Sequence, residues 1–178
     1  MNTFKKLSIV IPVFNEARTL EAVLDAVTAV KLDLERELVI VDDGSRDGTR
    51  DILERRRGEH PEWKVCLHPE NRGKGAALQT GFATATGDLV LVQDADLEYD
   101  PRDYAALLEP ILAGKADVVF GSRFLGGRPH RVLSFWHYAG NRLLTLLSNM
   151  LTNLNLTDME VGYKLFKREI LQSLRLCE

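Results

Sequence analysis

Apolar runs alternate with amphipathic segments along the first 120 residues. Runs of apolar, β-favouring residues predict strands at 7–12, 38–41, 64–67, 89–92 and 117–121. The run at 89–92 is apolar throughout, which is typical of a strand that is buried on both faces of a sheet. Because the runs alternate with helical patterns, the sequence predicts an α/β fold: a mostly parallel sheet with helices on both faces.

Between these strands, apolar residues recur at helical spacing. Leu20, Val23, Leu24 and Val27 fall at i, i+3, i+4 and i+7, so they share one face of a helix. The expected helices span 16–30, 47–59 and 76–85, and a fourth starts at residue 101. Asn15 is the expected N-cap of the first helix, and Asp100 followed by Pro101 is typical of a helix start.

The pattern changes after residue 122. Gly126–Pro129 predicts a link, and a strongly apolar helix is expected over 134–154. Two interpretations of this helix stay open. It packs against the sheet as part of the core, or it lies on a membrane surface as an interfacial helix near Arg128 and Arg131.

Length and composition narrow the class of protein. The 178 residues suit one domain, 1–178, and the net charge of −3 argues against non-specific nucleic-acid binding. Cys66 and Cys177 lie far apart in the sequence and do not make a disulfide framework, which fits a reducing cytoplasm. No apolar stretch reaches the roughly 18 residues that a membrane span needs. We therefore expect a cytoplasmic domain.

Carboxylates follow two of the buried strands. Asp94 and Asp96 come directly after residues 89–92, and Asp42 and Asp43 follow residues 38–41. The carboxyl ends of parallel strands share one edge of a sheet, where ligands bind in open α/β folds. A pair of carboxylates one residue apart suits Mg²⁺ or Mn²⁺. The alternative for residues 42–44 is a plain turn, which Asp and Gly favour for backbone reasons.

Two common nucleotide-binding motifs are absent from the sequence. Neither the dinucleotide fingerprint nor the Walker phosphate loop occurs after a strand, and the segment 73–75 is too short to be either. A nucleotide would therefore not be held by a glycine-rich cradle. We expect a metal ion that bridges its diphosphate to do this instead.

Five motifs carry a resemblance to a known family. They are Ile9–Glu16 (IVIPVFNE), Val41–Ser45 (VDDGS), Asn71–Gly75 (NRGKG), Asp94–Asp96 (DAD) and Gly121–Arg123 (GSR). Their order and spacing resemble a family 2 inverting glycosyltransferase with the GT-A fold, the nucleotide-diphosphosugar transferase fold. The dolichyl- or polyprenyl-phosphate mannosyltransferase-like branch is the most similar, and the resemblance covers nearly the whole chain.

The resemblance implies a role for each matching residue. The residues that would bind the nucleotide sugar are Pro12, Phe14, Glu16, Asp42, Lys74, Asp94, Ala95, Asp96 and Arg123. Those that would bind the metal are Asp94, Asp96 and Glu98, and the catalytic set adds Arg123 and Asp158 to the acidic pair. Arg123 would neutralise phosphate charge, and Asp158 would be the carboxylate of the acceptor-side loop 158–164. Glu160–Val161 departs from the small residues that this branch carries there.

The function implied is transfer of a hexose from a nucleotide diphosphate sugar, of GDP-mannose or UDP-glucose type, to a polyprenyl phosphate. The cofactor would be Mg²⁺ or Mn²⁺, and the domain would lie at the inner face of the membrane. Two alternatives stay open: a soluble transferase acting on a hydroxyl group of a glycan or small molecule, and a non-catalytic subunit that binds nucleotide sugars. Since relatives continue past the acceptor loop, we expect the chain to be truncated at its C-terminus.

Overall fold

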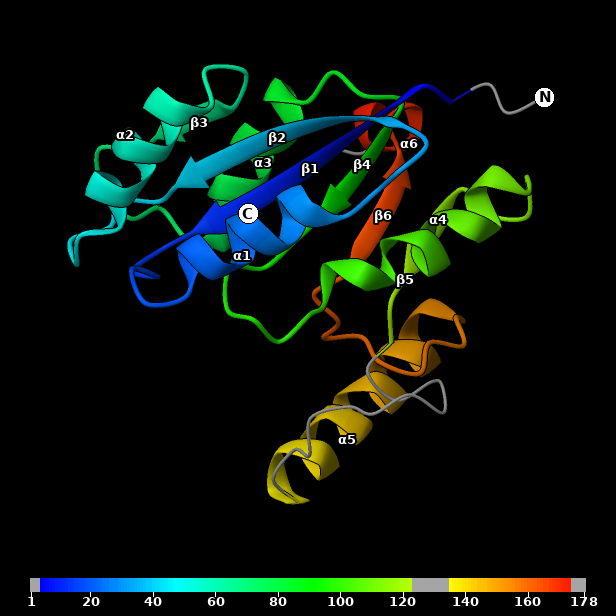
Figure 1. Ribbon diagram of the computed structural model, residues 1–178. Coiled ribbons are helices and arrows are strands. Elements are labelled where there is room, and N and C mark those ends of the chain that lie inside the picture. Colours follow the sequence, from blue (N-terminus) through cyan, green and yellow to red (C-terminus); the bar gives the residue numbers. More distant parts are fainter. Residues whose placement is uncertain (1–3, 123–134, 174–178) are drawn as a thin grey trace.

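The computed structural model describes residues 4–122 and 135–173, and its centre is a six-stranded sheet with helices on both faces (Figure 1). The strands are β1 (Lys6–Val13), β2 (Glu35–Asp42), β3 (Lys64–Leu67), β4 (Leu89–Val92), β5 (Val118–Phe120) and β6 (Lys164–Lys167). The helices are α1 (Leu20–Ala29), α2 (Thr49–Glu59), α3 (Lys74–Thr84), α4 (Tyr104–Leu112), α5 (Phe135–Thr152) and α6 (Arg168–Ser173), with a 3₁₀ turn at Pro101–Asp103. The expected fold class is confirmed.

The strand order is β3-β2-β1-β4-β6-β5. The first four strands pair in parallel, whereas β6 is antiparallel to both β4 and β5. The sequence analysis did not predict β6, because Lys164–Lys167 is short and carries a lysine at each end. This strand brings the chain back from residue 163 to lie beside β4, which ends at the acidic pair.

Alternate residues of the central strands enter two separate cores. On one face Ile9, Ile11 and Leu91 pack with the apolar stripe of α1 and with α4. On the other face Val10 and Val90 pack with α3 and α6. Each fully buried aliphatic side chain stabilises the fold by about 1.5–3 kcal/mol. The sheet is thus held from both sides, and this makes its carboxyl edge a firm base for a site.

The start of α1 corrects one expectation. The helix begins at Leu20 rather than at residue 16, and Thr19 is its N-cap residue. Asn15 has a φ of 56°, and its Oδ1 accepts a hydrogen bond from the backbone N–H of Arg46. Asn15 therefore holds two strand-end loops together instead of capping the helix. The start at Asp100 is confirmed, since its carboxylate accepts from the N–H of Arg102.

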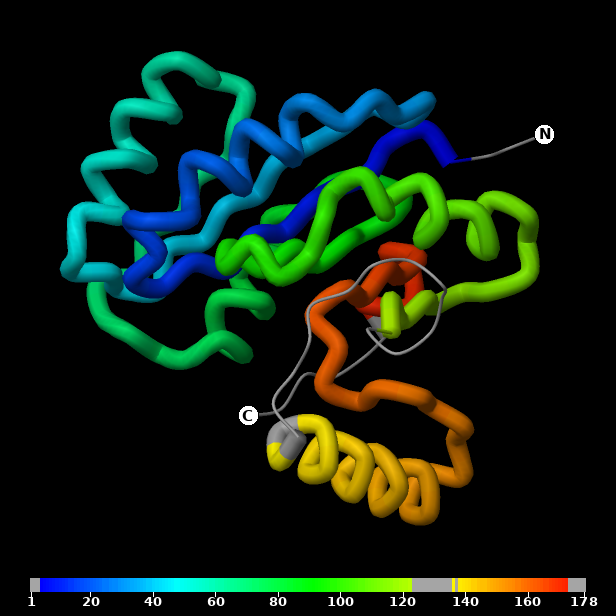
Figure 2. Tube along the Cα trace, turned by 60° about the horizontal axis from the view of Figure 1, so that its bottom comes forward, coloured from blue at the N-terminus to red at the C-terminus, as the bar shows by residue number. Residues whose placement is uncertain are grey.

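Helix α5 lies outside the layers that cover the sheet, in both views (Figures 1 and 2). Its apolar residues face outward: Trp136 is 82% exposed, Met150 71% and Leu151 87%. The interpretation of this helix as core packing is therefore wrong. Within the described residues, no helix combines the length and the apolar character needed to cross a bilayer.

Candidate functional site

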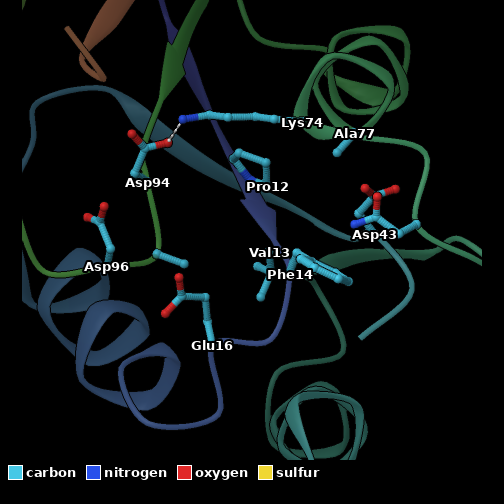
Figure 3. A pocket seen from close by; sticks show the side chains of 11 residues that line it. Pro12, Val13, Phe14, Glu16, Asp43, Lys74, Ala77, Asp94 and Asp96 are labelled. Carbon is cyan, nitrogen blue, oxygen red and sulfur yellow. Dashed lines mark ion pairs between the residues drawn. The ribbon is translucent and has the colours of Figure 1, made fainter. Parts of the chain in front are cut away.

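A pocket opens at the carboxyl ends of β1, β2 and β4, with the N-terminus of α3 beside it (Figure 3). It is lined by Pro12, Val13, Phe14, Glu16, Asp43, Asn71, Lys74, Ala77, Asp94, Ala95 and Asp96. The strand ends that carry Asp42–Asp43 and Asp94–Asp96 share one edge as expected, and the end of β1 joins them. Asp43 lies on one side of the pocket, and the acidic pair that follows β4 lies on the other.

The carboxylate of Asp94, the first residue of the acidic pair, has neighbours on two sides. The Nζ atom of Lys74, the first residue of α3, lies 2.6 Å from Oδ1 of Asp94. On the other side of this carboxylate, a Cβ placed on Gly162 would come within 2.4 Å of its Oδ2, so only glycine fits there. The neighbouring carboxylate, Asp96, accepts from the backbone N–H of Glu98 through Oδ1. Asp94 therefore turns Oδ1 toward the pocket.

Asp94 and Asp96 suit a divalent metal ion that is also coordinated by the phosphates of a bound substrate. Hard oxygen donors on one side of a pocket are what Mg²⁺ and Mn²⁺ prefer, and Mg²⁺ commonly uses one or two carboxylates together with substrate phosphates. Glu98, the expected third ligand, does not line the pocket. Across residues 4–122 and 135–173, no three His, Cys, Asp or Glu side chains gather into a metal-binding group. The fit is to a two-carboxylate site.

At the end of β2, Asp42 is not among the residues that line the pocket. Its side chain is fully buried and accepts hydrogen bonds from Nε of Arg50, at 2.7 Å, and from the N–H of Ser45. Successive side chains of a strand point in opposite directions, so the next residue, Asp43, reaches the pocket instead. The sequence analysis missed Asp43 as a pocket residue.

Asp43 also fixes the position of the loop 71–73, which leads into α3 beside the pocket. Its carboxylate accepts from the backbone N–H groups of Arg72 and Gly73, at 2.8–3.2 Å. Nδ1 of His68 lies 2.7 Å from the same carboxylate, and Nε2 of His68 lies 2.9 Å from Oγ1 of Thr80. Through these contacts one buried carboxylate fixes the segment that carries Asn71 and Lys74.

Residues 158–163 of the acceptor-side loop, which precede β6, pack directly behind the acidic pair. The hydroxyls of Tyr104 and Tyr163 both donate to Oε1 of Gln93, and Nε2 of Gln93 donates to the carbonyl of Asp94. Burial raises the pKa of Tyr104 and that of Tyr163 well above the ordinary range, so both phenols stay protonated donors. The backbone of Asp94 is therefore tied to the loop through a buried network.

The structure places the remaining expected residues as follows. Asp158 is buried, and its Oδ1 accepts from Nδ2 of Asn141, at 3.1 Å. It does not line the pocket, although Gly162 in the same loop touches Asp94. Arg123 lies outside the described residues. The pocket thus brings together Pro12, Phe14, Glu16, Lys74, Asp94, Ala95 and Asp96 of the expected set.

Curated relatives cover nearly all of this chain. It is 34% identical over 177 residues to the undecaprenyl-phosphate 4-deoxy-4-formamido-L-arabinose transferase of Pseudomonas syringae pv. syringae, which covers 97% of this chain and 50% of that protein. The corresponding enzyme of Aeromonas hydrophila subsp. hydrophila is 32% identical, covering 98% and 52%. The chain spans about half the length of these relatives.

Solved structures and a family comparison agree with this picture. The glucosyl-3-phosphoglycerate synthase of Mycobacterium tuberculosis, solved with Mn²⁺, UDP and phosphoglyceric acid, superposes with a TM-score of 0.73 at 27% identity. The match covers 96% of this chain and 58% of that one. The sequence model described as Glycosyl transferase family 2 matches residues 8–175. With its two-carboxylate pocket at the sheet edge, this chain belongs to glycosyl transferase family 2.

Proposed function

We propose that the protein transfers a hexose from a nucleoside diphosphate sugar to a polyprenyl phosphate, with inversion at the anomeric carbon and with Mg²⁺ or Mn²⁺. The observation that carries this proposal is the pocket, in which Asp94, Asp96 and Lys74 lie together at one end. Supporting it, the transferases of Pseudomonas and Aeromonas are named for undecaprenyl phosphate.

The nucleoside would lie at the end of the pocket formed by β1 and β2. Phe14 is 45% exposed at this end and offers a ring face on which a base can stack. Pro12, Glu16 and Asp43 complete the walls around it, and Asn71 supplies an amide. Charged and polar groups on the wall can then select the base and the ribose by hydrogen bonding.

The diphosphate would lie at the opposite end, against the acidic pair. Asp94 and Asp96 would hold the metal ion, which supplies charge stabilisation for the leaving diphosphate. Lys74 would turn from Asp94 to the phosphate oxygens, and Ala95 keeps the floor between the carboxylates small. Arg123 would add a guanidinium, whose fork suits phosphate oxygens. Glu98 would join the metal only if its loop rearranged.

Whether the reaction needs a general base depends on the kind of acceptor. A polyprenyl phosphate is already ionised near pH 7, so its oxygen attacks without losing a proton. A hydroxyl acceptor would need a carboxylate to remove its proton, and Asp158 in the acceptor-side loop is the candidate. With a phosphate acceptor no such proton has to be removed, and Asp158 would keep its bond to Asn141 and hold the acceptor-side loop.

A lipid acceptor requires that the domain meet a membrane. The outward face of α5 carries Trp136, Leu147, Met150 and Leu151, and indole rings such as that of Trp136 are enriched at membrane interfaces. Arg142 lies exposed on the same helix, and Arg128 and Arg131 precede it in the sequence. We therefore propose peripheral association with the cytoplasmic face of a membrane.

A second candidate function is transfer to a soluble hydroxyl acceptor. The observation that favours it is the likeness to glucosyl-3-phosphoglycerate synthase, whose structures hold UDP-glucose and phosphoglyceric acid. In this alternative Asp158 would act as the general base, and α5 would pack against further protein.

Two measurements test the proposal. Calorimetry with Mn²⁺ and UDP-glucose, UDP-N-acetylglucosamine or GDP-mannose identifies the donor, and transfer from that donor is then assayed with undecaprenyl phosphate and with 3-phosphoglycerate. We expect lipid-linked product only. Product from 3-phosphoglycerate alone would replace the first candidate by the second. Donor binding without transfer to any acceptor would favour the non-catalytic subunit.

A further inference from the structure

Helix α5 presents polar side chains to the rest of the protein. Asn141, Thr145 and Asn149 follow one another at intervals of four residues and so form a stripe along one face of the helix. Asn141 and Thr145 are buried, at 2% and 4% exposure, while the leucines of the helix are exposed. The helix is therefore attached to the protein by hydrogen bonds, and its apolar residues are left for another surface.

Asn141 makes the central contacts of this stripe. Its Nδ2 donates to Oδ1 of Asp158, at 3.1 Å, and to Oε2 of Glu160, at 2.9 Å. Its Oδ1 accepts from Oγ1 of Thr145, which in turn accepts from the N–H of Met159. One amide group thus bridges two carboxylates of the acceptor-side loop, and its own orientation is fixed from the helix.

Farther along the same loop, the chain touches the acidic pair. The N–H of Gly162 donates to the hydroxyl of Tyr99, at 2.6 Å, and its Cα lies against the carboxylate of Asp94. Only Val161 separates Gly162 from Glu160 in the chain. A shift of the two bridged carboxylates would therefore be transmitted to the acceptor side of the donor pocket.

We propose that Asn141 is a positioning residue, which holds the acceptor-side loop in register with the donor pocket during transfer. The proposal rests on the proposed function, since it concerns the acceptor of that reaction. Two carboxylates that share a site repel each other, and a donor between them offsets this repulsion. Without the amide, Asp158 would keep its burial but lose a hydrogen bond, and the loop would move to solvate it.

The test compares Asn141→Ala with Asn149→Ala. Asn149 is the matched control, because among the described residues the same amide on the same helix bonds only the backbone of Leu156. We expect Asn141→Ala to lower kcat for transfer to the acceptor by roughly 10- to 100-fold, the scale of a misplacement of about 1 Å. The donor KM and the affinity for nucleoside diphosphate with Mn²⁺ should change by less than about twofold. Asn149→Ala should leave kcat within about threefold.

Hydrogen exchange gives a second measurement that does not depend on the acceptor. The amides of residues 158–162 should exchange at least about tenfold faster in Asn141→Ala than in Asn149→Ala. If wild-type protein transfers sugar to no acceptor, the proposed function fails. Hydrogen exchange alone then tests whether Asn141 holds the acceptor-side loop. Equal losses of kcat in the two variants, or equal exchange where no transfer occurs, would overturn the positioning role.

Discussion

The donor pocket and helix α5 expose opposite kinds of side chain. At the pocket, apolar strands are buried on both faces, and carboxylates and Lys74 emerge at their ends. On α5, Asn141 and Thr145 are buried, and Trp136 and Leu151 face outward. The pocket thus gathers its polar groups from the ends of β1, β2 and β4 and from the start of α3. The helix has its stable polar contacts on the inside and leaves apolar surface outside, as expected for a segment that meets lipid.

Under the proposed function, the donor and the acceptor would be recognised by different kinds of interaction. A charged, soluble donor needs fixed carboxylates, amides and a cation, and these need a rigid sheet edge. A lipid acceptor needs an apolar surface beside that edge. The loop 158–163 is where the two regions meet, since it bonds Asn141 on one side and packs against Asp94 on the other.

The largest expected effect is at the acidic pair. Asp94→Asn or Asp96→Asn should weaken binding of the nucleoside diphosphate with Mn²⁺ by at least about 100-fold, because each removes a charged oxygen donor from the metal. Calorimetry measures this directly. Asp117→Asn is the control, because Asp117 pairs with Lys167 at the exposed end of β5. Wild-type affinity in both pocket variants would show that the metal site is misplaced.

Glu37 tests whether the pocket depends on the far edge of the sheet. Its buried carboxylate pairs with Lys6 and Lys64 and accepts from Ser8 and Thr86. Glu37→Gln should lower the free energy of unfolding at pH 7 by about 3 kcal/mol, as expected when one partner of a buried ion pair is lost. Denaturant unfolding gives this value, and nucleotide affinity of the folded variant should not change.

The pH dependence of this effect has a definite sign. Burial opposes ionisation of Glu37, but hydrogen bonds from Lys64, Ser8 and Thr86 outweigh it and hold its pKa well below the ordinary 4.5. The carboxylate therefore stabilises the fold fully above about pH 5, and this contribution is lost as the pH falls further. The difference between wild type and Glu37→Gln should shrink below pH 4. A constant difference down to pH 3 would contradict the assignment.

On α5, the prediction concerns lipid surfaces. Met150→Glu with Leu151→Glu should weaken co-sedimentation with phosphatidylglycerol vesicles by roughly 30-fold, about 2 kcal/mol, because two partly inserted side chains are lost. Binding by wild type should also fall as salt rises. Leu112→Glu, an exposed leucine of α4, is the control. Wild-type protein that ignores these vesicles at low salt would remove α5 as the membrane contact.

The smallest expected effect is at Lys74. Because its ammonium and a metal ion compete for Oδ1 of Asp94, Lys74→Met should strengthen binding of Mn²⁺ alone. The exposed ion pair is worth about 0.2–1 kcal/mol, so the gain should be at most about fivefold. Affinity for the nucleoside diphosphate with Mn²⁺ should fall instead, since a phosphate partner is lost. Calorimetry with and without nucleotide separates the two, and a loss in both would contradict the competition.

Much of the fold could be predicted from local pattern. The strand at 89–92 was predicted correctly, because four consecutive apolar residues admit few alternatives, and this also placed Asp94 and Asp96 at the end of the strand. The start of α1 was wrong because Asn15 is a good cap by residue type but bonds Arg46, which is distant in the sequence. Strand β6 was missed because Lys164–Lys167 is defined by its neighbours, β4 and β5, rather than by its own composition.

By itself, the sequence determined the alternation of strands and helices and placed acidic residues at one sheet edge, because both follow from short-range periodicity and strand direction. Only the tertiary structure decided which aspartate after β2 faces the pocket. That choice depends on hydrogen bonds from distant residues. Arg50 donates to Asp42, and the backbone N–H groups of the loop 71–73 donate to Asp43. The tertiary structure also decided which face of α5 is buried. The sequence of the helix does not indicate this, because the partners of Asn141 are Asp158 and Glu160 in a separate loop.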